Sequence, residues 1–222
     1  MISASRNPSA VGVLALQGSV APHLAALEAL GVSAISVRKP ATLDQVDRLI
    51  VPGGESTALW RLLCHAQLWE PIGARAASGD LALFGTCAGA ILLGRETQSE
   101  PPPRWGIVQV TVDRNAYGNQ VDSFIGPIDY RIAPLTQGAV GEPNGGVLSP
   151  SGAHHGANHG ANHGAEGVFI RAPRFRDPGP AVQVLAERAG EPIALRQERV
   201  IIATFHPELS TDRRLHRLFL DL

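Results

Sequence analysis

Short apolar runs alternate with segments of helical periodicity over the first half of the chain. Four apolar runs predict buried strands, at residues 11–16, 32–37, 48–51 and 81–84. Apolar residues at helical spacing follow three of these runs, at 22–31, around 59–63 and at 88–93. Strands that alternate with helices imply right-handed crossovers, so this half predicts a parallel sheet that is covered on both faces.

The pattern changes after Trp105, where strand-like segments follow one another without helices. Such segments lie at 107–112, 167–171, 181–187, 192–197 and 200–205, with a turn signal at Gly118-Asn119. Asp212 is placed to cap a closing helix. We therefore expect an α/β fold of three layers, doubly wound, with a mostly parallel sheet and antiparallel additions.

One domain over residues 1–222 is expected, because 44% hydrophobic residues in a chain of 222 can form a sizeable core. Residues 138–164 are an exception, since they are rich in Gly, Pro, Ser and His and have too few apolar residues to offset ordering. We interpret them as a flexible insertion. Its histidines lack an acidic or cysteine companion, so a spacer is favoured over a metal site, and no metal or cofactor is predicted.

Charge and terminal sequence narrow the classes of partner. The net charge of -1 gives no broad positive field, so neither nucleic acid nor an anionic membrane surface is an expected partner. The first ten residues lack the apolar core of a signal peptide, and no run approaches the roughly 18 apolar residues of a spanning helix. A cytoplasmic location is predicted, where Cys64 and Cys87 stay unpaired.

The segment Gly85-Thr-Cys-Ala-Gly89 has the spacing of a nucleophile elbow, which predicts Cys87 at the apex of a sharp strand-to-helix turn. The N-terminus of the following helix places N–H groups and partial positive charge beside the sulfur. The N–H of Ala88 is thus a candidate oxyanion-hole donor. The alternative is a small buried cysteine at a tight turn.

A histidine and an acid follow the last predicted strand, in Phe205-His-Pro-Glu208. In extended geometry residues two apart point the same way, so Glu208 is placed to orient the ring of His206 while its other nitrogen faces Cys87. A strand exit with solvated polar residues is the alternative. Together with the elbow, the pair predicts a cysteine-dependent catalytic triad.

The glycine turn Pro52-Gly-Gly-Glu-Ser-Thr57 follows a predicted parallel strand, where doubly wound folds bind their ligands. Its N–H groups, at Gly53 and Gly54, are expected to face a substrate oxygen, although the turn also suits a helix cap at Ser56 or Thr57. Cys64 is interpreted as a core residue. Three other histidines are interpreted as structural or solvated: His23, His65 and His216.

Taken together, several segments resemble the family of glutaminase subunits of pyridoxal 5'-phosphate synthases, within the triad class of glutamine amidotransferases. The elbow and the His-Pro-Glu segment are typical of the whole class, whereas Gly-Gly-Glu-Ser-Thr, Asp-Ser-Phe and Phe-Ile-Arg-Ala-Pro indicate this member. The similar segments are residues 13–18, 49–57, 84–89, 113–115, 120–124, 168–173 and 205–209. The stretch between Phe124 and Gly167 is longer than the family pattern.

The resemblance implies hydrolysis of L-glutamine through a thioester on Cys87, with His206 as base and then acid, and with Glu208 orienting His206. It also implies transfer of the ammonia to the lyase subunit of the synthase. The residues that it implies at the substrate are Gly54, Glu55, Ser56, Arg114, Ile170 and Arg171, and those of the oxyanion hole are Gly53, Gly54 and Ala88.

Two other functions stay open at this stage. One is an amidotransferase subunit that serves histidine, purine or cobyric acid synthesis, which partner identity would distinguish. The other is a catalytically silent binding subunit, which the intact Cys, His and Glu set disfavours and which an assay of glutamine hydrolysis would test.

Overall fold

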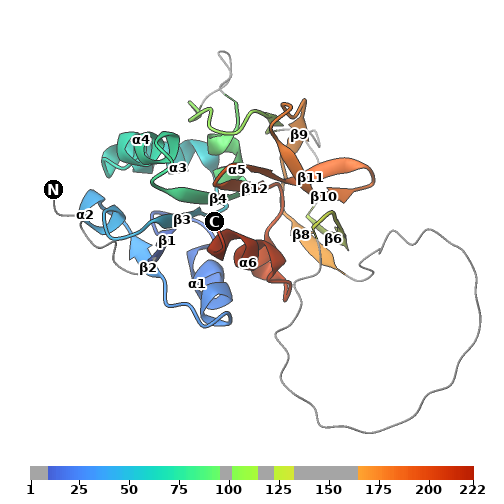
Figure 1. Ribbon diagram of the computed structural model, residues 1–222, viewed down its shortest axis with the longest axis horizontal. Helices are drawn as coiled ribbons and strands as arrows, with labels where there is room; N and C mark the ends of the chain where they lie inside the picture. Colours follow the sequence, from blue (N-terminus) through green and yellow to red (C-terminus); the bar gives the residue numbers. More distant parts are fainter. Residues whose placement is uncertain (1–9, 96–101, 115–122, 133–164) are drawn as a thin grey trace, which may run out of the picture.

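The computed structural model describes residues 10–95, 102–114, 123–132 and 165–222 (Figure 1). Its main sheet has eight strands in the order β2-β1-β3-β4-β12-β11-β10-β7. The strands from β2 to β12 are parallel, and β11, β10 and β7 add to them antiparallel. This arrangement confirms the predicted fold class.

The parallel half contains every strand that was predicted there. Its elements are β1 (Val11–Leu14), α1 (Val20–Glu28), β2 (Ile35–Val37), α2 (Pro40–Leu43), β3 (Arg48–Val51), α3 (Ser56–His65), α4 (Trp69–Ala77), β4 (Ala82–Thr86) and α5 (Ala88–Leu93). The remaining elements are β5 (Thr111–Asp113), β6 (Phe124–Pro127), β7 (Asp129–Tyr130), β8 (Glu166–Phe169), β9 (Arg174–Arg176), β10 (Gln183–Arg188), β11 (Glu191–Gln197), β12 (Val200–Ala203), the 3₁₀ turn η1 (Pro207–Leu209) and α6 (Arg214–Leu220).

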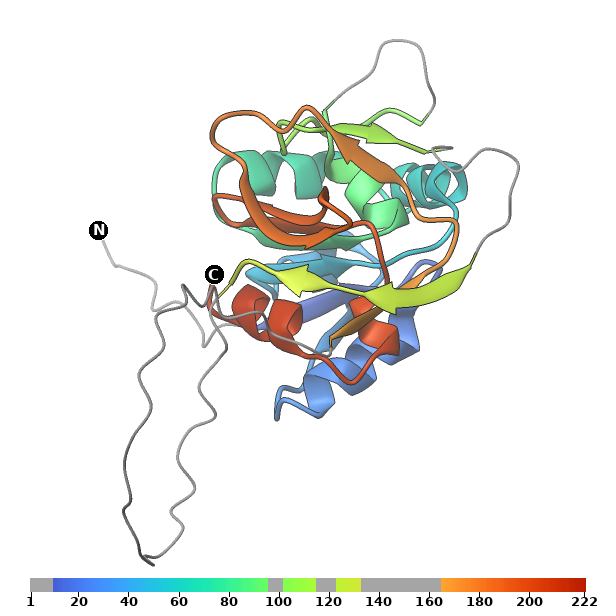
Figure 2. The ribbon, with the colours of Figure 1, turned by 90° about the vertical axis from the view of Figure 1, so that its right-hand side faces the viewer.

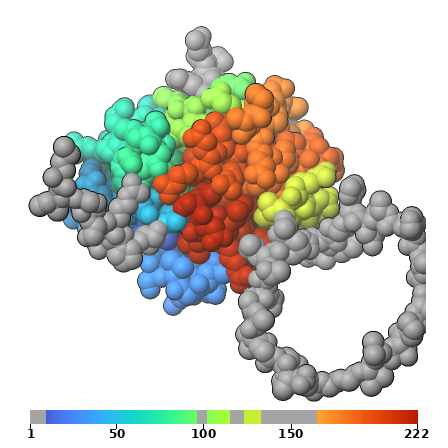
Figure 3. Space-filling model, viewed as in Figure 1, coloured from blue at the N-terminus to red at the C-terminus, as the bar shows by residue number. Residues whose placement is uncertain are grey.

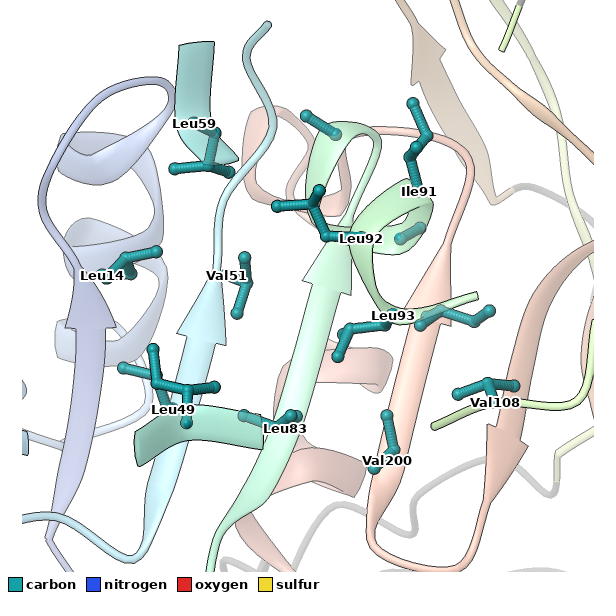
Figure 4. Close-up of a cluster of buried hydrophobic side chains, with 14 of the residues drawn as sticks. Leu14, Leu49, Val51, Leu59, Leu83, Ile91, Leu92, Leu93, Val108 and Val200 are labelled. Carbon is teal, nitrogen blue, oxygen red and sulfur yellow. The ribbon is translucent and has the colours of Figure 1, made fainter. Parts of the chain in front are cut away.

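Two hydrophobic clusters lie between the sheet and its helices, one on each face, because apolar side chains cover both faces of the central strands. One cluster packs α3, α4 and α5 on the sheet through residues such as Leu59, Leu92 and Leu49 (Figure 4). The other packs α1 and α6 on the opposite face through Leu27 and Phe219. Figure 2 shows the sheet between these two layers.

The prediction of a strand at 107–112 is mostly wrong, since only Thr111–Asp113 forms a strand, which pairs with β9. The preceding residues run along α5 instead, where Val108 N donates to Leu93 O at 2.9 Å and the Val108 side chain is buried. Apolar burial without a neighbouring strand therefore produced the alternating pattern. Cys64 is also not a core residue, because α3 turns it to the exposed side.

Several predictions concern residues outside the described ranges. They are the turn at Gly118-Asn119 and the insertion at 138–164 with its four histidines. Within the described ranges, no helix is long and apolar enough to cross a bilayer.

Candidate active site

The carboxyl ends of β1, β3, β4 and β12 meet at a cleft of about 510 Å³. Parallel strands bring these ends to one edge of the sheet, so segments far apart in the sequence become neighbours there. Nine of the residues expected at the site line the cleft: Gly53, Gly54, Glu55, Ser56, Cys87, Arg114, Ile170, Arg171 and His206.

Cys87 occupies the strained turn between β4 and α5, with φ 47° and ψ -101°. Its N–H donates to Ala203 O at 2.9 Å, which ties the turn to β12. A side chain at Gly89 would overlap the carbonyl of Val51, so the turn requires a glycine there. Cys87 is 6% exposed and its Sγ lies 3.8 Å from Ile170 O. With the strained turn and the required glycine, this is the geometry of a nucleophile elbow.

His206 and Glu208 form a buried pair, in which His206 Nδ1 lies 2.7 Å from Glu208 Oε1. The backbone N–H of His206 donates to Val168 O, which fixes the ring's attachment point against β8. Glu208 does not continue an extended strand, as the sequence reasoning assumed, because η1 turns it back beneath the imidazole. The 3₁₀ turn thus brings the Glu208 carboxylate to the imidazole of His206, whereas the sequence analysis expected an extended strand to do so.

Cys87 and His206 converge above Gly53, the glycine that follows Pro52 at the end of β3. A Cβ at Gly53 would lie 3.2 Å from Cys87 Cβ and 3.1 Å from His206 Nδ1. Burial alone would lower the pKa of His206, but its interactions with Cys87 and Glu208 outweigh burial and raise that pKa to about 10. The imidazolium form is favoured at neutral pH, as a thiolate–imidazolium pair requires.

Glu55 is the N-cap of α3, where Ser56 or Thr57 was expected. Its carboxylate accepts the N–H of Thr57 at 3.0 Å and the N–H of Ala58 at 2.5 Å. Arg114 Nη2 lies 3.5 Å from the same carboxylate and 3.3 Å from Thr57 Oγ1. Arg114 is therefore held at the rim of the cleft by the residues that cap α3.

The peptide groups of the glycine turn are partly engaged. The N–H of Gly53 donates to Thr86 Oγ1 at 3.0 Å, and its carbonyl accepts the N–H of Ser19 at 3.1 Å. In this conformation the N–H of Gly53 is not directed to a substrate oxygen. The N–H of Ala88, at the first position of α5, has no partner inside that helix.

Sequence reasoning missed four residues near the site: Ser19, Pro22, Ile91 and His23. The first three line the cleft, and their positions shortly after the first predicted strand and after the elbow were the available signals. His23 lies behind the His206–Glu208 pair, with Nε2 3.4 Å from Glu208 Oε2. His23 and His216 are fully buried, which excludes the solvated alternative for both, whereas His65 is exposed.

Comparison with known proteins gives matches over most of the chain. The model of the SNO glutamine amidotransferase family matches residues 13–136 and 157–222. The pyridoxal 5'-phosphate synthase subunit PdxT of Chloroflexus aurantiacus is 44% identical over 216 residues, covering 96% of this chain and 99% of that protein. The PdxT of a Thermus thermophilus strain is 44% identical over 213 residues, with 96% of each chain covered.

Solved structures show the same relationship. A crystal structure of a glutamine amidotransferase superposes with a TM-score of 0.77 at 41% identity, covering 96% of this chain and 98% of that one. The structure of PurLQS from Thermotoga maritima, at 14% identity and a TM-score of 0.60, shares the fold alone. The family match spans most of the chain, and the relatives are similar over nearly their full length. The chain belongs to the SNO glutamine amidotransferase family.

Proposed function

We propose that this chain is the glutaminase subunit of a pyridoxal 5'-phosphate synthase and that Cys87, His206 and Glu208 form its catalytic triad. The assignment of the subunit follows from relatives named PdxT, which are 39–44% identical over nearly the whole chain. The observation that supports the triad is the convergence of Cys87 and the His206–Glu208 pair in one cleft at the strand ends. The metal-free chemistry of a thiolate nucleophile suits these residues.

The first half of the proposed reaction forms a thioester. The Cys87 thiolate attacks the side-chain amide carbon of L-glutamine, and the carbonyl π electrons move to oxygen. Since Nδ1 of His206 is hydrogen-bonded to Glu208, the proton on Nε2 of His206 is the one available to the leaving nitrogen. Collapse of the tetrahedral intermediate breaks the C–N bond, releases ammonia and leaves a glutamyl thioester.

The second half returns the enzyme to its starting state. Neutral His206 takes a proton from water, and the hydroxide attacks the thioester carbon. The C–S bond then breaks, which releases L-glutamate and regenerates the thiolate beside the imidazolium. Burial alone would raise the pKa of Glu208, but interactions that include its hydrogen bond with His206 outweigh burial and lower that pKa. Glu208 therefore stays ionised and stabilises the positive charge on His206 in both halves of the reaction.

The oxyanion is proposed to bind at the N–H groups of Ala88 and the glycine turn. Gly53 would first have to release Thr86, so a rearrangement of Gly53 and Gly54 is required before the turn contributes fully. Docking of the lyase subunit is proposed to favour that rearrangement. An amidotransferase regulated in this way releases ammonia only when a partner can use it.

The proposed glutamine contacts surround the elbow. Arg114 and Arg171 supply forked donors that suit the α-carboxylate, and the segments Gly54–Ser56 and Ile170–Arg171 line the cleft. Arg171 adopts a left-handed backbone, φ 43°, which turns this segment at the cleft edge. The cytoplasmic location and the insertion at 138–164 stay predictions. The interruption of the family match between 136 and 157 supports the insertion.

The proposed partner is a lyase subunit that forms pyridoxal 5'-phosphate. The test is an assay of glutamate release by the chain alone and with that subunit. We expect low activity alone and a large increase in the complex. A partner that neither binds nor activates the chain would exclude this pathway even if Cys87 proves catalytic.

A further inference from the structure

Two histidines from opposite ends of the chain meet beneath the triad. His23 on α1 and His216 on α6 are both 0% exposed, and these helices lie side by side (Figures 1 and 3). Phe84 of β4 packs edge-on against both rings, with ring centroids 6.2 Å from His23 and 5.4 Å from His216. The orientation of both imidazoles is therefore fixed by packing.

His23 makes polar contacts through both of its ring nitrogens. Its Nδ1 lies 3.1 Å from His216 Nε2, while its Nε2 lies 3.2 Å from Thr86 Oγ1 and 3.4 Å from Glu208 Oε2. Among the described residues, Glu208 Oε2 is buried and makes no hydrogen bond, and His23 Nε2 lies within ion-pair distance of it. A carboxylate oxygen only accepts, so the tautomer with a proton on Nε2 of His23 is the one that stabilises it.

The rest of the cluster agrees with that tautomer. With the proton on Nε2, Nδ1 of His23 accepts from the Nε2–H of His216, and the unpartnered Nδ1 of His216 carries a lone pair rather than a stranded N–H. The chain of polar contacts thus runs from His216 through His23 and Glu208 to His206, which in turn interacts with Cys87.

We propose that His23 is a positioning residue of the glutaminase site, whose Nε2–H holds the second carboxylate oxygen of Glu208 and thereby the angle at which His206 meets Cys87. This inference rests on the proposed triad. His23 does not touch the substrate cleft, since Glu208 and His206 lie between them. It acts only through Glu208.

The electrostatic surroundings keep His23 neutral, as this role requires. Burial lowers the pKa of His23 to about 4, with His206 and Arg213 acting in the same direction and Glu208 in the opposite one. Burial also lowers the pKa of His216 to about 3. A neutral donor stabilises the Glu208 carboxylate without competing with His206 for its charge.

Thr86 links this cluster to the glycine turn. Its hydroxyl oxygen accepts the N–H of Gly53 at 3.0 Å and also lies 3.2 Å from His23 Nε2. If the N–H of Gly53 leaves Thr86 during activation, Thr86 loses one donor and its oxygen remains beside His23. The same imidazole thus lies next to both the acid of the triad and the anchor of the oxyanion turn.

The test compares amide and aliphatic replacements of His23. The His23→Gln variant keeps an amide at the distance of Nε2, whereas His23→Asn is shorter and retains polarity only near His216. The His23→Leu variant removes the polar atoms that face Glu208 and His216. The matched control is Leu27→Ala, which loosens the same helix in the core without touching the polar cluster.

Two readouts are measured. The first is kcat and KM for glutamine in the complex, and the second is the rate at which iodoacetamide alkylates Cys87 in the free chain. The alkylation series is run from pH 5 to 9 in a Cys64→Ser background, since Cys64 is exposed. Loss of the N–H group beside a buried carboxylate oxygen predicts a kcat about 10- to 100-fold lower for Asn and Leu, with KM changed little. Alkylation at pH 6 should fall about tenfold in the same variants, because an unsupported Glu208 carboxylate takes up a proton at higher pH. Gln should stay near wild type in both.

Each outcome decides the matter. Wild-type kcat and alkylation in the Asn variant would overturn the proposal, as would a Gln variant that is as defective as Asn. The Asn and Gln pair still decides if the Leu variant fails to fold. An alkylation profile altered equally by Leu27→Ala would show general loosening and would also overturn it. If the wild-type complex hydrolyses no glutamine, the proposed function fails, while the alkylation series still tests His23.

Discussion

Replacing Gly53 by alanine separates geometry from chemistry, because it changes none of the three residues of the proposed triad and alters only their positions. The new methyl group would lie 3.2 Å from Cys87 Cβ and closer still to Cε1 of His206, below the 3.0 Å that real Cβ contacts essentially never cross. The elbow is fixed to β12, so the imidazole is the group that yields. A displacement on the order of 1 Å costs about 100-fold in kcat.

The assay is glutamate release by Gly53→Ala in the complex, accompanied by thermal unfolding. The matched control is Gly12→Ala in β1, where a Cβ would lie 2.7 Å from the buried side chain of Val37 and far from the cleft. We expect the control to lose stability and keep its kcat, whereas Gly53→Ala loses kcat. Wild-type kcat in a folded Gly53→Ala variant would refute the convergence of Cys87 and His206 on this glycine.

Three other predictions test separate parts of the account. Arg114→Lys should raise the KM for glutamine about tenfold with little effect on kcat, because an ammonium lacks the forked donors; an unchanged KM would argue against a carboxylate site there. Acidification from pH 6.5 toward 4 should lower the free energy of unfolding by up to about 1.4 kcal/mol per pH unit for each of His23 and His216. The reason is that their folded pKa values, about 4 and 3, lie below the unfolded value, so only the unfolded chain takes up protons in this range. Denaturant titrations at pH 7 and 5 measure this, and a slope that His216→Phe leaves unchanged would contradict it. Excising 138–164 should preserve folding and basal glutaminase activity, as circular dichroism and glutamate release would show; loss of either would contradict the view of a spacer.

The sequence predicted those parts of the fold whose pattern is local. The four apolar runs of the first half became β1 to β4, and the elbow required only its own glycines and the following helix. The alternation at 107–112 was misleading because a segment that packs along a helix can bury alternate side chains without pairing. Short elements such as α2, β7 and β9 depend on tertiary contacts and left no periodic signal.

The proposed triad was accessible from sequence because each member lies in a distinctive segment. Its supporting residues were not. His23 and His216 are separated by most of the chain, and each looks like an isolated histidine on a helix until α1 and α6 come together beneath β4. The cap at Glu55 was missed for a similar reason, since Ser56 and Thr57 are the usual capping types and only the structure shows which side chain reaches the free N–H groups.

Cys87 is proposed to release ammonia from glutamine for use by the lyase subunit. The most direct measurement is the formation of pyridoxal 5'-phosphate by Cys87→Ala with that subunit, ribose 5-phosphate and glyceraldehyde 3-phosphate, with either glutamine or an ammonium salt as the nitrogen source. We expect this variant to form product from ammonium and none from glutamine. Product formed from glutamine at the wild-type rate would contradict it.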